Sequence, residues 1–273
     1  MLLLIKIYIK KRKITIETSD FIYGKNNVIE LLQAGERRIN KIMLLKTGHG
    51  DKRVDKIIQL AKDNSIPFSF VPKEKFKNYE EYSHQGVIAF ASPIEYKELE
   101  TFIEETKEGY KKVIILDEVE DPHNVGSIVR TAVCAGYDAV ILPKRRSSLI
   151  NATVEKASAG AINHIDIITV NSIQNTIDTL KDNDFWIIAT VTDAEDNYFD
   201  IDYTDMNFAL IMGNEKSGIS RTLVKNSDFR VRIPIEKNFD SLNVANAASI
   251  IMYESVRQVI QKGKNKKHVN QKD

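Results

Sequence analysis

Apolar residues in the last two-thirds of the chain gather in short runs that alternate with helix-length stretches of mixed polarity. Continuous apolar strands separated by helices are typical of a mostly parallel sheet covered on both faces. The pattern therefore predicts an α/β domain, whose strands would lie at 113–116, 139–142, 165–170, 186–191, 208–212 and 230–233. Its last predicted helix, about 241–261, is the longest.

The first third of the chain predicts a second, smaller α/β unit. Apolar runs indicate strands at 41–45, 66–71 and 87–91. Helices are expected at 26–34, 51–63 and 73–82. Gly35 follows the first helix as its stop signal. A compact unit of roughly 70 residues falls at the small end of the domain range.

The two units and their flanks divide the chain into five segments. Before the small unit, a basic arm contains alternating residues that could form a short strand at 14–18. Between the units, a charged stretch with few apolar positions is interpreted as a helical linker. The lysine-rich end is expected to be a mobile tail. The predicted division is arm 1–20, small unit 21–93, linker 94–110, large unit 111–261 and tail 262–273.

Composition removes several classes of protein. With 42% hydrophobic and 28% charged residues, the 273-residue chain is not disordered as a whole. With a net charge of +1, the chain as a whole is not strongly basic, so any binding of a nucleic acid would depend on local clusters of positive charge. One cysteine, Cys134, allows no internal disulfide and fits a reducing cytosol. No stretch approaches the roughly 20 apolar residues that span a bilayer, so a cytoplasmic protein without a membrane partner is expected.

Common cofactor motifs are missing from the sequence. There is no Gly-x-Gly-x-x-Gly after a strand and no phosphate-binding loop ending in Gly-Lys-Ser/Thr. The five histidines lack metal-ligand spacing, so no metal is expected. The chemistry is therefore expected in the loops that follow the strands, where open α/β sheets build their sites.

The first candidate block, 116–130, joins a strand end to a helix. Asp121 and Pro122 are a good helix start, which places Asn124 near the helix N-terminus and Arg130 inside the helix. Gly126, one turn before Arg130, would leave room beside the guanidinium. This arrangement suits an anionic partner such as a phosphate. The alternative is a surface arginine and a glycine tolerated for helix–sheet packing.

The second block, 209–220, is an apolar strand that breaks into a loop with two glycines, Gly213 and Gly218. Glycines allow a ligand to approach the backbone closely. Glu215 would stand at the carboxyl end of the strand, where ligands bind in this class of fold. The alternative is an ordinary strand–turn–helix corner with a solvated glutamate.

The third block consists of 231–235 and, after a spacer, 241–248. Asp240 or Ser241 could cap the long helix. Asn243 and Asn246, three positions apart, would share a face near the helix start. An asparagine pair and a run of alanines are unusual on a purely solvated helix. A buried amphipathic core helix is the competing interpretation, and both can hold together.

In order and spacing, the three blocks resemble the motifs of the SpoU family, RNA ribose 2′-O-methyltransferases of the SPOUT superfamily. The matching residues are Asn124-x-Gly126-x-x-x-Arg130, Gly213-Asn214-Glu215-x-x-Gly218 and Ile233-Pro234-Ile235 with Ser241-Leu242-Asn243-Val244-Ala245. Segments 23–30 and 84–89 resemble the small N-terminal RNA-substrate-binding domain of the ribosomal-RNA branch, whose fold is like that of a ribosomal protein. The resemblance spans about 21–261.

The resemblance implies a SPOUT domain with a deep trefoil knot, whose loops bind S-adenosyl-L-methionine, and a homodimer whose sites form where two knots meet. Cofactor-binding positions would be Thr190, Gly213, Ile233 and Leu242. Active-site positions would be Arg130, Asn124, Glu215, Ser241 and Asn243. Two departures, Ala245 in place of a frequent serine and Asn246 in place of a small apolar residue, bear on substrate preference.

The function implied is S-adenosylmethionine-dependent 2′-O-methylation of a ribose, in a guanosine of large-subunit ribosomal RNA. Arg130 would stabilise the developing alkoxide or accept its proton, and Glu215 would orient Arg130. Within the family, a transfer-RNA methyltransferase and a relative that confers antibiotic resistance through large-subunit RNA are alternatives. Outside it, the alternative is an RNA-binding assembly factor without catalysis, which cofactor affinity would distinguish.

Overall fold

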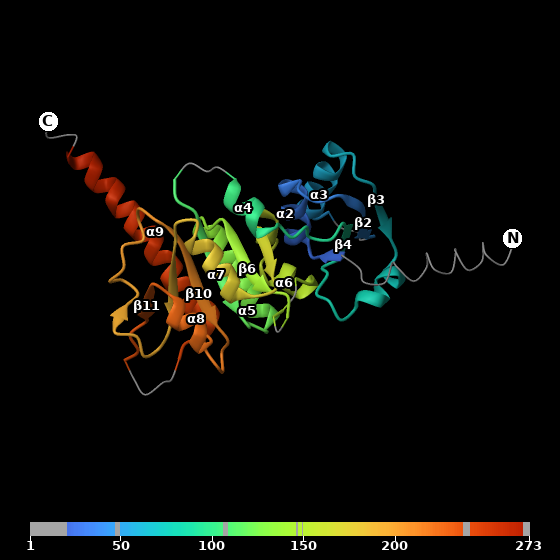
Figure 1. The fold of residues 1–273 in the computed structure, drawn as a ribbon. Helices are drawn as coiled ribbons and strands as arrows, with labels where there is room; N and C mark the ends of the chain where they lie inside the picture. The colour runs from blue at the N-terminus through green and yellow to red at the C-terminus, as the bar shows by residue number, and fades with distance from the viewer. Residues whose placement is uncertain are drawn as a thin grey trace, which may run out of the picture. The chain divides into compact units, whose positions relative to one another are not determined.

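A computed structural model describes residues 21–46, 50–105, 109–145, 147–148, 150–236 and 241–269 of the chain. These residues form two compact units that divide between Pro93 and Ile94, each with its own sheet (Figure 1). In the described ranges, no helix combines the length and the apolar character needed to cross a membrane. The predicted arm, with its strand at 14–18, lies outside the described residues.

The first unit is a four-stranded sheet with two helices on one face. The strand order is β1-β4-β2-β3, for β1 (Phe21–Tyr23), β2 (Ile39–Leu45), β3 (Phe68–Val71) and β4 (Val87–Ala91). Helices α2 (Lys25–Ala34) and α3 (Lys52–Asp63) bury their apolar sides against it. Gly35, in the left-handed region at φ 72°, ends α2 as predicted.

Two local elements of this unit differ from the sequence prediction. Strand β1 was not predicted, because three residues are too few to show a period, and its antiparallel pairing with β4 is a tertiary effect. The expected helix at 73–82 is a 3₁₀ helix, η1 (Lys73–Tyr79). Phe76 anchors η1 in the unit, 2% exposed, with its ring 4.7 Å from that of His84.

The second unit contains a seven-stranded sheet in the order β7-β6-β5-β10-β8-β11-β9. Every neighbouring pair is parallel, which confirms the predicted sheet. The strands are β5 (Lys112–Asp117), β6 (Ala139–Pro143), β7 (Asp166–Val170), β8 (Phe185–Thr190), β9 (Asp196–Asn197), β10 (Asn207–Gly213) and β11 (Phe229–Arg232).

Helices cover both faces of this sheet, also as predicted. One face packs against α5 (Pro122–Cys134), α6 (Ala152–Ala157), η2 (Ala161–His164) and α9 (Val244–Val269). The other packs against α4 (Leu99–Glu104), α7 (Ile173–Lys181) and α8 (Arg221–Asn226). Because strand side chains alternate between faces, Ile114 and Leu116 point to the first layer, and Val113 and Ile115 to the second.

Both ends of the large unit differ from the prediction. The expected linker helix is only six residues long, and Leu99 and Phe102 bury it against the sheet. The last helix begins three residues later than predicted and continues past Gln261 to Val269. Its extension is held by Lys262, whose Nζ donates to Thr204 Oγ1 at 2.9 Å. The trefoil knot implied by the resemblance stays a prediction.

Candidate active site

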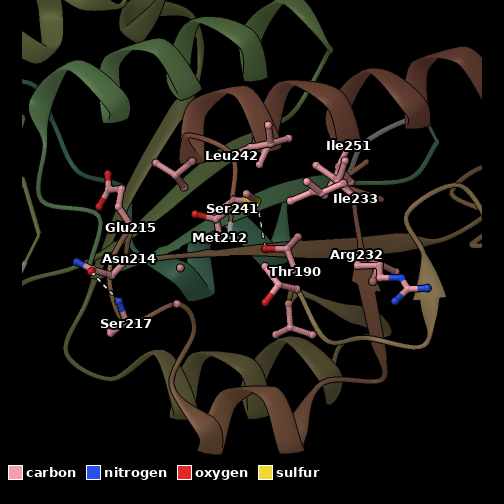
Figure 2. A pocket seen from close by; sticks show the side chains of 18 of the residues that line it. Thr190, Met212, Asn214, Glu215, Ser217, Arg232, Ile233, Ser241, Leu242 and Ile251 are labelled. Carbon is pink, nitrogen blue, oxygen red and sulfur yellow. Dashed lines mark hydrogen bonds between the residues drawn. The ribbon is translucent and has the colours of Figure 1, made fainter. Parts of the chain in front are cut away.

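A cavity of about 500 Å³ lies at the carboxyl ends of β8, β10 and β11, beside the first turns of α9 (Figure 2). This is the edge at which parallel α/β sheets bind ligands, and the volume is in the range of small-molecule sites. Both Glu215 and Ser241 line the cavity, together with all four residues predicted to bind the cofactor: Thr190, Gly213, Ile233 and Leu242.

The second sequence block builds one wall of this cavity. A Cβ added at Gly213 would lie 2.3 Å from the carbonyl carbon of Gly218, so no larger residue fits there. Asn214 and Gly218 close the loop through two backbone hydrogen bonds, of 3.2 and 2.9 Å. Gly213 is therefore required by the closed loop itself, beyond the ligand approach predicted from the sequence.

The lining combines apolar surface with backbone donors. Buried Met212, Val231 and Ile251 offer apolar contact, while the backbone N–H groups of Ile233 and Leu242 donate to no other described residue. A nucleoside is bound through both apolar contacts and hydrogen bonds, because its base has apolar faces and polar edges. These residues therefore fit the adenosine portion of S-adenosylmethionine.

The side chains around the cavity are not all directed into it. Figure 2 shows Thr190, Met212 and Ser241 near its centre, whereas Arg232 turns outward. Thr190 Oγ1 donates to the Ile211 carbonyl at 2.8 Å, which fixes the end of β8 to β10. Four further lining residues were not among the predicted site residues, although the first three stood inside candidate blocks: Asn214, Ser217, Ile235 and Ile251.

A chain of side-chain hydrogen bonds joins the three sequence blocks. Asn124 Nδ2 donates to Glu215 Oε1 at 2.6 Å, and Asn243 Nδ2 donates to Asn124 Oδ1 at 3.0 Å. Asn243 Oδ1 accepts from the N–H groups of Ala245 and Asn246, at 3.0 and 3.3 Å. Asn243 therefore caps α9, and the prediction that Ser241 could do so was wrong. The other predicted cap, Asp240, lies outside the described residues.

Arg130 does not join this chain. It is exposed on α5, is not among the residues that line the cavity, and makes no hydrogen bond or ion pair with a described residue. Within one chain Glu215 accepts a hydrogen bond from Asn124, and the orientation of Arg130 by Glu215 stays a prediction. Arg130 remains available for a partner.

Gly126 serves packing rather than Arg130. It is buried, and an added Cβ would lie 2.4 Å from Ala157 Cβ and 2.8 Å from the Val154 carbonyl oxygen. Helix α6 therefore approaches α5 closely at this point. The alternative was correct about a surface arginine, but the glycine packs against another helix and not against the sheet; the expectation of room beside the guanidinium was wrong.

Residues beside Arg130 form a contact between α5 and α9. The hydroxyls of Thr131 and Ser249 lie 3.2 Å apart. The next exposed positions on α9 are apolar, with Ile250 37% exposed and Tyr253 49% exposed. Thr131, the residue after Arg130, thus contacts α9, and exposed apolar side chains follow along that helix. In the described ranges, no group of three His, Cys, Asp or Glu side chains could hold a metal ion.

A parallel α/β unit with a pocket of about 500 Å³ at its strand ends is typical of enzymes that bind a nucleotide-like cofactor. The model of the SpoU rRNA methylase family matches residues 111–253, and that of an RNA 2′-O ribose methyltransferase substrate-binding domain matches 21–97. A TrmH family tRNA/rRNA methyltransferase of Staphylococcus aureus strain MSSA476 is 42% identical, over 87% of this chain and 95% of its own. The chain belongs to the SpoU methylase family.

Two solved structures share the fold over about nine-tenths of the chain, and a third shares it over 60%. The SpoU methyltransferase AviRb of Streptomyces viridochromogenes, bound to AdoMet, is 21% identical with a TM-score of 0.75, over 90% of this chain and 93% of its own. An AdoMet-bound rRNA methyltransferase of Sinorhizobium meliloti is 24% identical with a TM-score of 0.74, over 89% and 88%. A tRNA-modifying TrmH/SpoU enzyme of A. aeolicus, 29% identical with a TM-score of 0.52, covers 60% of this chain and 82% of its own.

Family membership confirms the enzyme class predicted from the three motifs. The protein is an RNA 2′-O-methyltransferase that uses S-adenosylmethionine as its methyl donor.

Proposed function

We propose that this enzyme methylates the ribose 2′-hydroxyl of a guanosine in large-subunit ribosomal RNA. The supporting observation is the pairing of a methylase unit with a complete substrate-binding unit in one chain. The neighbour named for rRNA matches about nine-tenths of this chain, 89%, whereas the neighbour named for tRNA covers 60%. An RNA-substrate unit attached to the catalytic unit favours a large, folded RNA, and the cytoplasm is where such a protein would meet it.

In the proposed site, the cavity residues Thr190, Gly213, Ile233 and Leu242 bind the cofactor. When bound, S-adenosylmethionine supplies an electrophilic methyl group that passes from sulfur to the ribose oxygen, as the S–C bond breaks and the hydroxyl loses its proton. Positioning of the ribose by the protein can lower the barrier by roughly 7–11 kcal/mol in favourable cases. Ser241, Asn124 and Glu215 are at or beside the cavity and supply its hydrogen-bonding groups.

Arg130 is the proposed catalytic residue. Its guanidinium stabilises the negative charge that develops on the ribose oxygen, or holds the adjoining phosphate, and proton acceptance at Arg130 would need an unusual environment. Because Arg130 lies outside the cavity of its own chain, the proposed enzyme is a homodimer in which Arg130 serves the partner's cavity. The exposed Ile250 and Tyr253 of α9, the helix that Thr131 contacts, supply the apolar contact for a second copy in this proposal.

Transfer of label from S-adenosylmethionine to purified ribosomal and transfer RNA tests this proposal. The label is expected in large-subunit ribosomal RNA, at one guanosine whose 3′ linkage resists alkaline cleavage, because a methylated 2′-oxygen cannot attack the phosphate. Label in transfer RNA alone would contradict the proposed substrate and show that the enzyme methylates transfer RNA. Failure to bind the cofactor at all would favour the non-catalytic RNA-binding protein.

A further inference from the structure

A cluster of aromatic rings lies on the face of the small sheet that α2 and α3 leave uncovered. Ile22 and Ala89 point to the other face, where they pack with the two helices. Because side chains alternate along a strand, Phe21, Tyr23 and Phe90 point away from the helices. Phe21 lies opposite Phe90 in the pairing of β1 with β4, so their side chains are neighbours. This face therefore carries an aromatic surface that is separate from the core beneath the helices.

Two tyrosines, at and just after the end of η1, extend this aromatic cluster. The centre of the Tyr79 ring lies 5.1 Å from that of Phe21 and 6.3 Å from that of Phe90. The centre of the Tyr82 ring lies 5.0 Å from that of Phe21 and 5.1 Å from that of Tyr23. The planes of these paired rings are inclined by between 53° and 78°, so none of the contacts is a flat stack. The rings form one connected cluster built from three segments of the chain.

The outer members of the cluster can be reached by a ligand. Phe21 and Tyr23 are only 8% and 6% exposed and form the base of the cluster. The other three side chains, those of Tyr79, Tyr82 and Phe90, are half-buried and keep accessible surface. The Tyr79 hydroxyl makes no hydrogen bond with a described residue, whereas a buried tyrosine usually finds a partner. Tyr79 therefore offers both accessible surface and a free hydroxyl to a ligand.

Charge is distributed unevenly around the cluster. Lys41 is exposed and holds its Nζ 4.8 Å from the centre of the Phe90 ring. Glu80 and Glu81, which are also exposed, follow Tyr79 directly and disfavour a phosphate at that ring. The small unit as a whole is basic, since residues 21–93 contain twelve lysines and arginines against eight aspartates and glutamates. A polyanion is therefore attracted to this unit, with its phosphates directed to Lys41 and not to Tyr79.

RNA with unpaired bases matches this combination of groups. Each base offers a flat face that stacks on aromatic side chains, whatever the sequence. A four-stranded sheet whose aromatic side chains stack bases is a recurring platform for single-stranded RNA. We propose that the aromatic cluster of the small unit binds unpaired bases of the substrate RNA at Tyr79, while Lys41 binds an adjoining phosphate. The proposal rests on RNA being the substrate, and it holds whether the target ribose belongs to ribosomal or transfer RNA.

Variants of Tyr79 separate this role from simple packing of its segment on the sheet. Tyr79→Leu keeps an apolar side chain but removes the ring, and affinity for single-stranded RNA is expected to fall about fivefold to a hundredfold. Tyr79→Phe keeps the ring and should stay within about twofold of the wild type. The Kd for S-adenosylmethionine should be unchanged in both variants, because the cofactor cavity lies in the large unit.

Phe70→Leu is the matched control for the loss of a ring in the same unit. Phe70 is 52% exposed, but its partner in the sheet, Leu44, packs with the helices, so the Phe70 side chain lies on the opposite face from the cluster. Its replacement should leave RNA affinity within about twofold of the wild type.

The deciding measurement is the Kd of the full-length enzyme for a single-stranded oligoribonucleotide and for a duplex of the same sequence. Tyr79→Leu should lose affinity for the single strand alone, because bases that are paired and stacked in a duplex have no free face. An unchanged affinity for the single strand, or an equal loss for both RNAs, would overturn the proposal.

Lys41→Gln tests the same surface by removing one exposed charge, and it decides the question if Tyr79→Leu does not fold. Loss of one phosphate contact should make the slope of log affinity against log salt concentration shallower by about 0.7 for single-stranded RNA. An unchanged slope would overturn the proposal. These are binding measurements, so the target RNA proposed above is tested separately, by methyl transfer.

Discussion

Asn243 uses its carboxamide oxygen to cap α9 and its nitrogen to hold Asn124, at 3.0 Å. Asn124 in turn donates to Glu215 at 2.6 Å. Because an asparagine has both a donor and an acceptor, one residue fixes the start of a helix and the orientation of a side chain 119 positions away. Three segments that are distant in the sequence are therefore held together at Glu215, which lines the cofactor cavity.

Asn243→Asp should separate the two tasks of this residue. A carboxylate retains the helix cap but has no donor for Asn124, whose oxygen it would face. We expect kcat to fall about tenfold or more, with the Kd for S-adenosylmethionine within about threefold and the melting temperature almost unchanged. Asn246→Asp, on the same helix turn, is the matched control and should keep near-normal kcat. An unchanged kcat in Asn243→Asp would show that the hydrogen-bond chain is dispensable.

Gly126→Ala should destabilise the large unit without touching the cavity. The added methyl would meet Ala157 and the backbone of α6 at 2.8 Å or less, so the two helices must separate. Overpacking of this kind costs about 1–3 kcal/mol of unfolding free energy. Gly263→Ala is the control and should raise the free energy of unfolding. This helical glycine has open space around it, and alanine favours a helix over glycine by about 1 kcal/mol. Denaturant unfolding measures the change in unfolding free energy for both variants. An unchanged stability in Gly126→Ala would contradict the close contact between α5 and α6.

The stability of the small unit should fall as the pH drops below about 6.5. Burial lowers the pKa of His84, and its Nδ1 accepts from the Gly86 N–H at 2.9 Å, which requires the unprotonated ring. The unfolded chain therefore binds the proton more readily, and unfolding is favoured as the pH falls through 6.5 towards the lowered pKa. Comparison of wild type with His84→Gln between pH 8 and 5 isolates this contribution. The same pH dependence in both proteins would exclude His84 as its source.

Negative charge at the exposed apolar positions of α9, Ile250 and Tyr253, should disrupt the proposed dimer. Ile250→Glu together with Tyr253→Glu places two carboxylates on the exposed side of α9. We expect a monomer by sedimentation and loss of methyl transfer, with each monomer still folded. Phe70→Glu, an equally exposed apolar position at 52% in the small unit, serves as the control for a change in surface charge. A dimer that survives the α9 changes would require a different interface.

The sequence was sufficient to predict the sheet and the cavity wall, and the reasons are local. Apolar runs such as 113–116 and 208–212 are long enough to show that both faces of a strand are buried. Gly213 and Gly218 mark a loop that only glycine can close. The partner of Glu215 could not be predicted, because Asn124 lies 91 residues away and only the folded sheet brings the two together.

The central claim is that Arg130 is the catalytic residue, and a comparison of wild type with Arg130→Ala tests it. Methyl transfer to ribosomal RNA is measured for wild type and Arg130→Ala, with the Kd for S-adenosylmethionine determined by calorimetry on the same preparations. The account predicts that transfer falls by about a hundredfold or more, the scale of a lost charge-stabilising group, while cofactor affinity stays within about threefold. Near-normal transfer by Arg130→Ala would contradict it and move the catalytic role to the residues inside the cavity.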